Sequence, residues 1–182
     1  VLNGTGKPLP QVLARKNRYW YEMRDTATAE FVTGMNPDRR LFVAKFDEPT
    51  FVNQRLIAFK RINDRVDADL LHALLNSILS MFYIEAIGFG RGLGALDINA
   101  TNIGSMMILN PARLTSANAA NILAAFEPLK HRKILGTTKE LEQEDRIHFD
   151  HIVLTAFGID RYYDSMRDAL LSMQRQRYAA KE

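Results

Sequence analysis

The sequence has no cysteine among its 182 residues. This absence excludes structural disulfides, zinc sites built on thiolates and cysteine nucleophiles from the chain. The sequence also lacks an apolar run of roughly 18 residues, the length that a membrane-spanning helix needs. Its first residues, Val1–Gly4, have neither the basic nor the apolar region of a signal peptide. We therefore expect a soluble, cytoplasmic protein.

Motifs of catalysis and nucleotide binding are scarce as well. The sequence contains no nucleophile elbow, P-loop, HExxH or EF-hand pattern. His148, Asp150 and His151 are close in sequence, and a small hydrolase built on them is one alternative. Their neighbours, however, are typical of a polar helix surface. We predict no catalytic residue and no metal site in this chain.

The chain begins at Val1 rather than at an initiator methionine. We therefore expect it to be part of a longer parent whose upstream segment carries further chemistry. Hydrophobic residues make up 47% of the chain, and its length is close to the usual domain size of about 150 residues. We predict one domain with an appendage.

Positive charge is concentrated near the N-terminus. Residues Val1–Arg61 contain 11 Lys or Arg against 6 Asp or Glu, whereas Ile62–Asn110 contain 2 against 5 and the remainder 11 against 10. A basic surface attracts phosphate and makes binding to a nucleic-acid backbone plausible, with a strong dependence on salt. A solvated basic face without a ligand is the alternative.

Basic and aromatic residues alternate within this first block. Arg15, Lys16 and Arg18 lead into Tyr19–Tyr21, a run that includes the single tryptophan. Aromatic rings stack on bases and cations neutralise phosphate, so the pattern favours a nucleic acid. The alternative is that Trp20 anchors the core while the charges lie in solvent.

Two strands are predicted after this block. Residues Leu41–Phe46 and Thr50–Ile62 alternate between apolar and polar side chains, and Asp47–Pro49 lies between them as a turn signal. The simplest structure for this pattern is a β-hairpin.

The clearest helical pattern covers Val66–Ile87, where apolar residues recur at steps of three and four. Asp67 or Asp64 is placed to cap its start, and Gly88 is placed to end it. His72 lies on this helix without an obvious acidic partner. We interpret this histidine as a structural or surface residue.

Two predicted loops present arginines. The turn Asn36–Asp38 precedes Arg39 and Arg40, and the segment Gly88–Gly94, with glycine at alternate positions, carries Arg91. Loop arginines can reach phosphate or guanine, and glycines allow a ligand to approach the backbone closely. Because these glycines follow a helix instead of opening one, a dinucleotide-binding loop is not predicted. A flexible connector is the alternative.

Short strands and then helices are predicted for the rest of the chain. Together the elements predict an α+β fold, with a small, mainly antiparallel twisted sheet and packed helices over residues 1–111 and a helical C-terminal tail over residues 112–182. The expected elements are strands at Ala95–Ile98 and Met106–Pro111, a helix from Ser116 to Phe126 stopped by Pro128, a capping box at Thr137 and Glu140, a helix over Ile147–Phe157 ended by Gly158, and a last helix capped by Asp160 and reaching about Tyr178. The basic connector Lys130–Lys133 either touches phosphate or is solvated.

Four stretches together resemble a known family. They are Ala73–Ser77, Phe82-Tyr83, Gly94–Ile98 and Ile108–Pro111. In this order they resemble the target-recognition domain of restriction-modification enzymes, and more specifically the C-terminal domain of bacterial N6-adenine DNA methyltransferases. The resemblance covers roughly Arg15–Arg177. The family's catalytic Asn-Pro-Pro-Tyr tetrapeptide and its cofactor loop are absent from this sequence.

The resemblance implies that this chain grips and reads a DNA duplex. A catalytic domain outside the chain would bind S-adenosylmethionine and extrude the adenine. The implied partners are double-stranded DNA and that catalytic domain, with no membrane and no cofactor in this chain. Asn53 and Gln54 are candidates for adenine recognition. The expected DNA contacts are Arg15, Lys16, Arg18, Arg39, Arg40, Asn53, Gln54, Arg55 and Arg91.

Two alternatives to this function remain at the level of sequence. The same features occur in the specificity subunits of multi-subunit restriction systems, to which the chain is also similar. A protein-interaction module is the second alternative, in which the helical tail docks a partner. The tail residues that would support docking are Ile159, Tyr162, Tyr163 and Met166.

Overall fold

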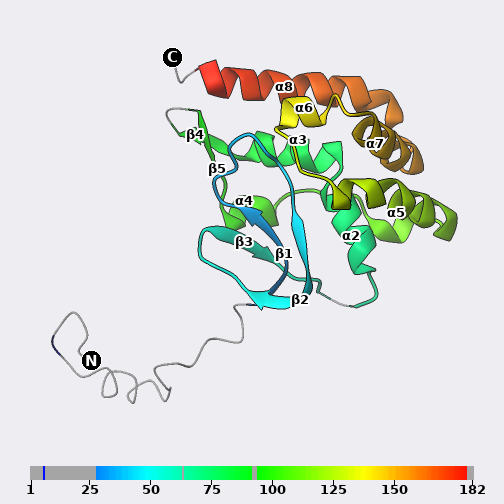
Figure 1. Ribbon diagram of the computed structural model, residues 1–182, viewed down its shortest axis with the longest axis horizontal. Helices are drawn as coiled ribbons and strands as arrows, with labels where there is room; N and C mark the ends of the chain where they lie inside the picture. Colours follow the sequence, from blue (N-terminus) through cyan, green and yellow to red (C-terminus); the bar gives the residue numbers. More distant parts are fainter. Residues whose placement is uncertain (1–5, 7–27, 63, 92–93, 180–182) are drawn as a thin grey trace.

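The computed structural model describes residues 28–62, 64–91 and 94–179, together with Gly6. Within these residues the architecture is α+β, as predicted, with the larger sheet at one end and the last helix, α8 (Tyr163–Ala179), at the other (Figure 1). The predicted DNA contacts Arg15, Lys16 and Arg18, as well as Trp20, lie outside the described residues.

The larger sheet has three antiparallel strands in the order β2-β1-β3. β1 (Thr28–Gly34) lies in the centre and pairs with both β2 (Ala44–Phe51) and β3 (Leu56–Phe59). The predicted hairpin is therefore wrong, because its two strands pair with β1 and not with each other. β1 takes the centre because most of its side chains are buried, whereas β2 is largely exposed.

The predicted turn at Asp47–Pro49 lies inside β2, as a bulge. Ala29 of β1 faces Thr50, while Phe31 faces Lys45. The four residues Phe46–Pro49 of β2 therefore lie between these pairs where β1 has only Glu30. A bulge bends an edge strand and accommodates proline, which has no N–H to donate to a neighbouring strand. The turn residues thus shape the edge of the sheet and do not reverse the chain.

The long helix predicted before the glycines is two helices, α2 (Ala68–Leu75) and α3 (Ile78–Ile87), bent by 60°. Asn76 lies at the break, as the C-cap of α2. Its side-chain Oδ1 accepts from the N–H of Val43 at 3.0 Å, and its Nδ2 donates to the carbonyl of Val43 at 2.8 Å and to that of His72 at 2.9 Å. The buried amide thus satisfies both backbone polar groups of Val43, 33 residues earlier in the chain.

The ends of these two helices agree with the sequence analysis. The carboxylate of Asp67 accepts a hydrogen bond from the N–H of Leu70 and caps α2, and α3 ends at Gly88. None of the described helices alone is long and apolar enough to cross a membrane. α2 and α3 reach that length and composition only as a pair separated by their bend.

A second, two-stranded sheet follows α3. β4 (Phe89–Arg91) pairs with β5 (Ala95–Asp97) in antiparallel register. The predicted strand after the glycines is therefore confirmed. The glycine-rich segment itself, expected to be a loop, supplies the first strand of this hairpin.

The strand predicted for Met106–Pro111 is not formed. The segment after the short helix α4 (Ala100–Gly104) forms neither a helix nor a strand up to Asn110. Of the side chains in this segment, those of Met107 and Ile108 are exposed by 67% and 46%, and Leu109 is buried. The apolar run therefore lies on the surface for most of its length.

The second half of the chain is helical, as predicted. The helix expected from Ser116 is capped by Thr115 and continues through Pro128, where the proline removes the hydrogen bond to the carbonyl of the exposed residue Ala124. Gly158, with φ of 72°, ends the next long helix as predicted. The elements are α5 (Ser116–His131), α6 (Thr137–Glu140), α7 (Glu144–Ala156) and α8, with 3-10 turns η2 (Pro111–Arg113) and η3 (Asp160–Tyr162).

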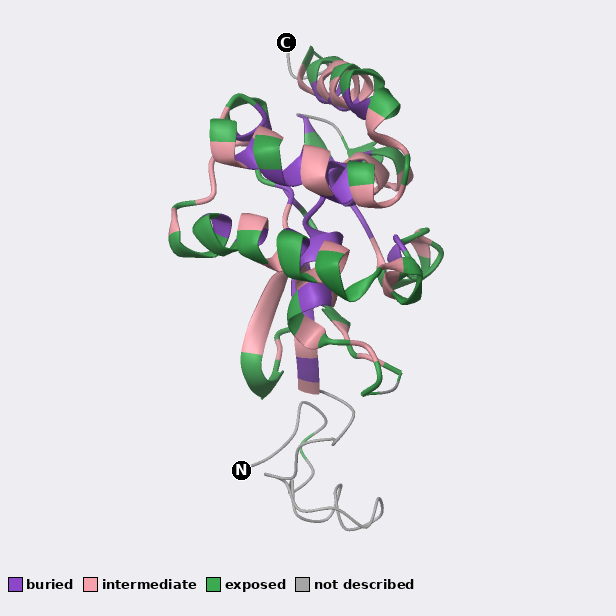
Figure 2. Cartoon of the chain, turned by 90° about the vertical axis from the view of Figure 1, so that its right-hand side faces the viewer, coloured by how far each residue is buried: buried purple, intermediate pink, exposed green. Residues whose placement is uncertain are grey.

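Two hydrophobic cores hold these elements together, and buried residues gather between the helices and the strands (Figure 2). In the first core the sheet packs with α3 and α8 around Phe31, Ile84 and Leu170. In the second, α2 packs with α5 and α7 around Leu74 and Phe149. Both cores combine residues from the sheet-containing half with residues from the helical half.

Candidate nucleic-acid interface

The loop that leaves β1 carries two of the predicted DNA contacts, Arg39 and Arg40, with both side chains exposed. Its backbone is held at several points. The side chain of Asn36 donates to the carbonyl of Leu96 at 3.4 Å, and the carbonyl of Arg39 accepts from both the N–H and the hydroxyl of Thr137, at 2.6 and 3.0 Å. The two guanidinium groups therefore project from a fixed backbone. Because the hydroxyl of Thr137 binds the carbonyl of Arg39, the capping box predicted at Thr137 and Glu140 is not formed.

A hollow of about 650 Å³ lies beside this loop. Its walls come from the end of β1, the start of β3 at Leu56 and the connection between α5 and α6. Arg39, Arg40 and Lys133 line it, and the described part of its lining includes one acidic residue, Asp38. The hollow is therefore electropositive.

The charges of Arg40 and Lys133 are not neutralised by neighbouring acids in the described part of the chain. Among the described residues, neither side chain makes an ion pair or a hydrogen bond. Arg39 has its guanidinium carbon 5.8 Å from the ring of Tyr178, a contact that leaves its charge unneutralised. These three cations are thus available to an anionic ligand.

The segment Asn53–Arg55 lies next to this loop, in the turn between β2 and β3 and not inside a strand as predicted. The carbonyl of Arg55 accepts from the N–H of Met35 at 3.0 Å, which places the turn against the start of the arginine loop. All three side chains are exposed, but Oδ1 of Asn53 is engaged with the N–H of Arg55 at 2.9 Å. Gln54 and Arg55 are therefore better placed than Asn53 to meet a ligand.

Arg91 lies on β4 and forms an ion pair with Asp97 of β5. Its side chain remains 67% exposed, and its guanidinium carbon lies 5.6 Å from the ring of Phe89. Arg91, predicted to lie in a loop, is therefore part of a paired strand, in register with Ala95. Arg91 can still touch a ligand, but part of its charge is already compensated.

The hairpin is anchored next to the arginine loop. The N–H of Ile98 donates to the carbonyl of Met35 at 2.9 Å. Gly94 has φ of 74°, and a Cβ at this position would lie 2.9 Å from Cδ1 of Tyr178. Only glycine fits this combination of backbone conformation and close contact. Backbone hydrogen bonds at Met35 thus connect the loop of residues 39 and 40 with the turn of residues 53–55 and with the hairpin that carries Arg91.

The basic connector predicted at Lys130–Lys133 is divided in the structure, where Lys133 has different surroundings from Lys130–Arg132. Lys130 and His131 contact Glu127 on the same helix. Arg132 binds Glu140 and Asp145 through four hydrogen bonds. Lys133 alone of this run remains unpaired at the hollow. Lys133 lies near Arg39 because Thr137 binds the carbonyl of Arg39. No pattern of neighbouring residues in the sequence could have predicted this.

His148, Asp150 and His151 on α7 have different surroundings. Asp150 is fully buried, where it accepts from the N–H of Ile78 at 2.8 Å and pairs with Arg146. Burial raises the pKa of Asp150, and the charge of Arg146 opposes this shift. His151 instead contacts Asp160, and His148 is exposed. Within the described ranges no three acidic or histidine residues gather as a metal site would require.

Two other predicted features have structural roles. Nε2 of His72 lies 2.9 Å from the carbonyl of Val43, and its ring packs edge-on against Phe126. Burial lowers the pKa of His72. In the tail surface expected for docking, Tyr163 is buried and Ile159 and Met166 pack against the core, so that Tyr162 alone of the four is exposed.

Comparison with known proteins does not assign this chain to a family: no family model matches it, and no curated protein or solved structure is significantly similar to it.

Proposed function

We propose that this chain binds double-stranded DNA through the surface formed by Arg39, Arg40, Arg55, Arg91 and Lys133, which we name the basic face. The observation that carries the proposal is the electropositive hollow, where Arg40 and Lys133 have no anionic partner among the described residues. Arginine and lysine at such a surface neutralise backbone phosphates, and exposed arginine and amide side chains read base edges.

The parent that this function suggests is an adenine-specific DNA methyltransferase of a restriction-modification system. In that protein the chain would serve as target-recognition domain, and S-adenosylmethionine would bind a domain outside it. The alternative parent is the specificity subunit of a multi-subunit restriction system. An Asn-Pro-Pro-Tyr tetrapeptide in the parent's upstream sequence would support the methyltransferase, and its absence from the complete parent would oppose it.

The experiment for DNA binding is a salt titration of fluorescence anisotropy with mixed-sequence duplexes. Each phosphate contact contributes about 0.9 to the slope of log affinity against log salt. The double variant Arg39→Ala/Arg40→Ala should therefore reduce the slope by about 2 and weaken binding at low salt by roughly ten- to hundredfold. Arg113→Ala/Arg175→Ala removes the same charge from two exposed arginines that do not line the hollow. Equal effects of the two double variants, or no binding by the unmodified chain, would contradict the proposal.

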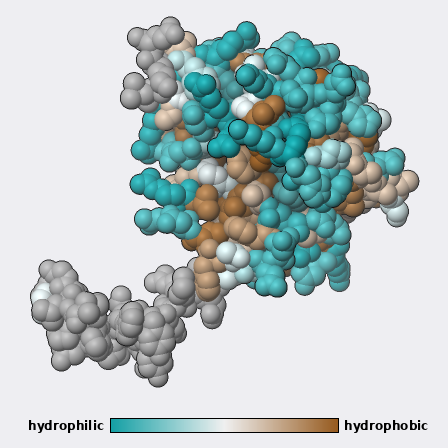
Figure 3. All heavy atoms as spheres, viewed as in Figure 1, coloured by the Kyte–Doolittle hydropathy of each residue, from teal (hydrophilic) through white to brown (hydrophobic). Residues whose placement is uncertain are grey.

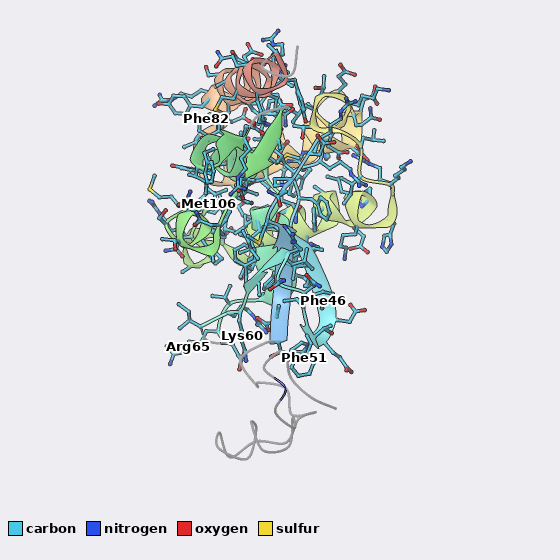
Figure 4. All side chains as sticks on the ribbon, turned by 90° about the vertical axis from the view of Figure 1, so that its left-hand side faces the viewer. Phe46, Phe51, Lys60, Arg65, Phe82 and Met106 are labelled. Carbon is cyan, nitrogen blue, oxygen red and sulfur yellow. The ribbon has the colours of Figure 1, made fainter. Side chains whose placement is uncertain are left out.

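A protein-interaction role is the second candidate, favoured by an apolar surface away from the basic face. A hollow of about 520 Å³ lies between β3, α2 and α4, and Ile62 and Met107 beside it are among the most exposed apolar side chains. Apolar residues are visible around the strands in Figure 3. Lys60 and Phe51, at the same end of the sheet, point away from the helices (Figure 4). Sedimentation of the chain mixed with the parent's upstream part tests this role, and Ile62→Asp should abolish any complex.

A further inference from the structure

Arg177, near the end of α8, is one of the most buried charged residues of the protein, with 5% of its side chain exposed. Its guanidinium grips the carboxylate of Glu85 on α3 through Nε to Oε1 at 2.7 Å and Nη2 to Oε2 at 3.0 Å. Burial alone would lower the pKa of Arg177, but the hydrogen bonds and charge of Glu85 outweigh this effect and raise it. Arg177 is therefore a permanent, rigidly held cation inside the protein.

The remaining donors of Arg177 reach the two loops of the basic face. Nη1 donates to the carbonyl of Gly94, which closes the β4–β5 hairpin, at 2.6 Å. Nη2 also donates to the carbonyl of Asp38, the residue before Arg39, at 3.2 Å. One planar group thus fixes the hairpin and the arginine loop relative to each other and to α3.

Tyr178 reinforces this arrangement from the next position on the helix. Its hydroxyl donates to the carbonyl of Asp38 at 2.7 Å, and its ring lies 4.5 Å from the guanidinium carbon of Arg177. The same ring is in contact range of Arg39 and against Gly94. Tyr178 therefore connects the buried cation with a cation of the basic face.

We propose that Arg177 and Tyr178 form a positioning clamp that sets how well the basic face discriminates between DNA sequences. This inference rests on the proposed DNA-binding function. Attraction of cations to phosphates changes little when a loop shifts by a fraction of an ångström, whereas bidentate contacts to base edges need the side chain within about 0.5 Å of its place. Loosening the clamp therefore costs discrimination while the non-specific grip persists.

A second buried pair supplies a matched control. Arg146 and Asp150, with 3% and 0% of their side chains exposed, are held by two hydrogen bonds as Arg177 and Glu85 are. The pair supports the start of α3 through Ile78, and the two residues make none of the hydrogen bonds that fix the arginine loop or the hairpin. Damage to it changes stability without touching the basic face.

The experiment uses the 182-residue chain and a pool of DNA duplexes of random sequence. The pool is selected for binding to the unmodified chain and sequenced, and the affinity for the enriched duplex is compared with that for the unselected pool. Tyr178→Phe removes the hydroxyl alone and should lower this specificity ratio about three- to tenfold, the effect of one lost hydrogen bond, with the salt slope unchanged. Arg177→Lys should lower the ratio further. Arg146→Lys should lower the melting temperature but leave the ratio as it is.

The outcomes separate the inference from the function on which it rests. If the unmodified chain binds no DNA, the proposed function fails and the inference falls with it. If the chain binds and selects a sequence, but Tyr178→Phe keeps the full specificity ratio, the clamp alone is wrong. The clamp is also wrong if the chain binds without any sequence preference, or if Arg146→Lys lowers the ratio as much as Arg177→Lys, since the effect would then reflect general loss of stability.

Discussion

Two basic segments of this protein look alike in sequence but have different surroundings. Arg39 and Arg40 follow a predicted turn, and the run Lys130–Lys133 spans the C-terminal end of α5. In the second segment nearly every charge is matched by an acid, and Arg132 alone binds both Glu140 and Asp145. In the first, the anchoring bonds go to the backbone and the side chains remain exposed. A basic segment is a candidate ligand site when the protein holds it through backbone hydrogen bonds and leaves its charged side chains without acidic partners.

The largest expected effect concerns the structural side of this comparison. Arg132→Ala should lower the free energy of unfolding by about 2 to 3 kcal/mol, because it leaves the buried carboxylate of Glu140 without its cation. Urea denaturation measures this loss. Lys130→Ala, which removes a contact with the exposed Glu127, should stay within about 0.5 kcal/mol of the unmodified chain. A comparable loss in both variants would show that the run is not divided as we describe.

The second effect is a pH dependence that originates beneath the same run. Burial lowers the pKa of His72 from its ordinary value of 6.5, and the positive charges of Lys45 and Lys130 lower it further. The unfolded chain then binds a proton more readily than the folded one, so stability is complete above pH 6.5 and is lost as the pH falls below it. Protonation would also leave the buried Nδ1, which lacks a partner among the described residues, with an unsatisfied N–H.

Unfolding midpoints measured between about pH 7 and about pH 5 test this expectation. His72→Gln keeps a side-chain donor for the carbonyl of Val43 but cannot be protonated in this range. The variant should therefore show a flatter stability curve than the unmodified chain. The carboxylate of Glu30, whose pKa is lowered by its hydrogen bonds with Arg61, loses its contribution only below its ordinary value of 4.5 and does not interfere. A slope that survives in His72→Gln would assign the effect to another group.

The same contrast shows how far the sequence alone could lead. Local signals predicted the cap at Asp67, the end at Gly158 and the exposed arginines after the turn, because each depends on residues a few positions away. The break at Asn76 was not predicted, since the contacts there are with distant residues: Asn76 binds the backbone of Val43, 33 residues earlier, and the N–H of Ile78 donates to Asp150, 72 residues later. The central strand β1 was missed because its role depends on partners from two later segments. The contact of Lys133 with the hollow depends on Thr137 and Arg39, 98 residues apart.

The smallest expected effect distinguishes two lysines of the same basic run, Lys133 and Lys130. Lys133→Ala should weaken binding to mixed-sequence DNA by about three- to tenfold and reduce the salt slope by about 0.9, the value of one phosphate contact. Lys130→Ala changes the net charge equally, three positions earlier, but should leave the slope unaltered because Lys130 is paired with Glu127. Both variants should unfold at the same urea concentration as the unmodified chain. Equal losses of affinity would mean that DNA responds to the overall charge of the protein, because a contact at the hollow requires Lys133 and not its neighbour.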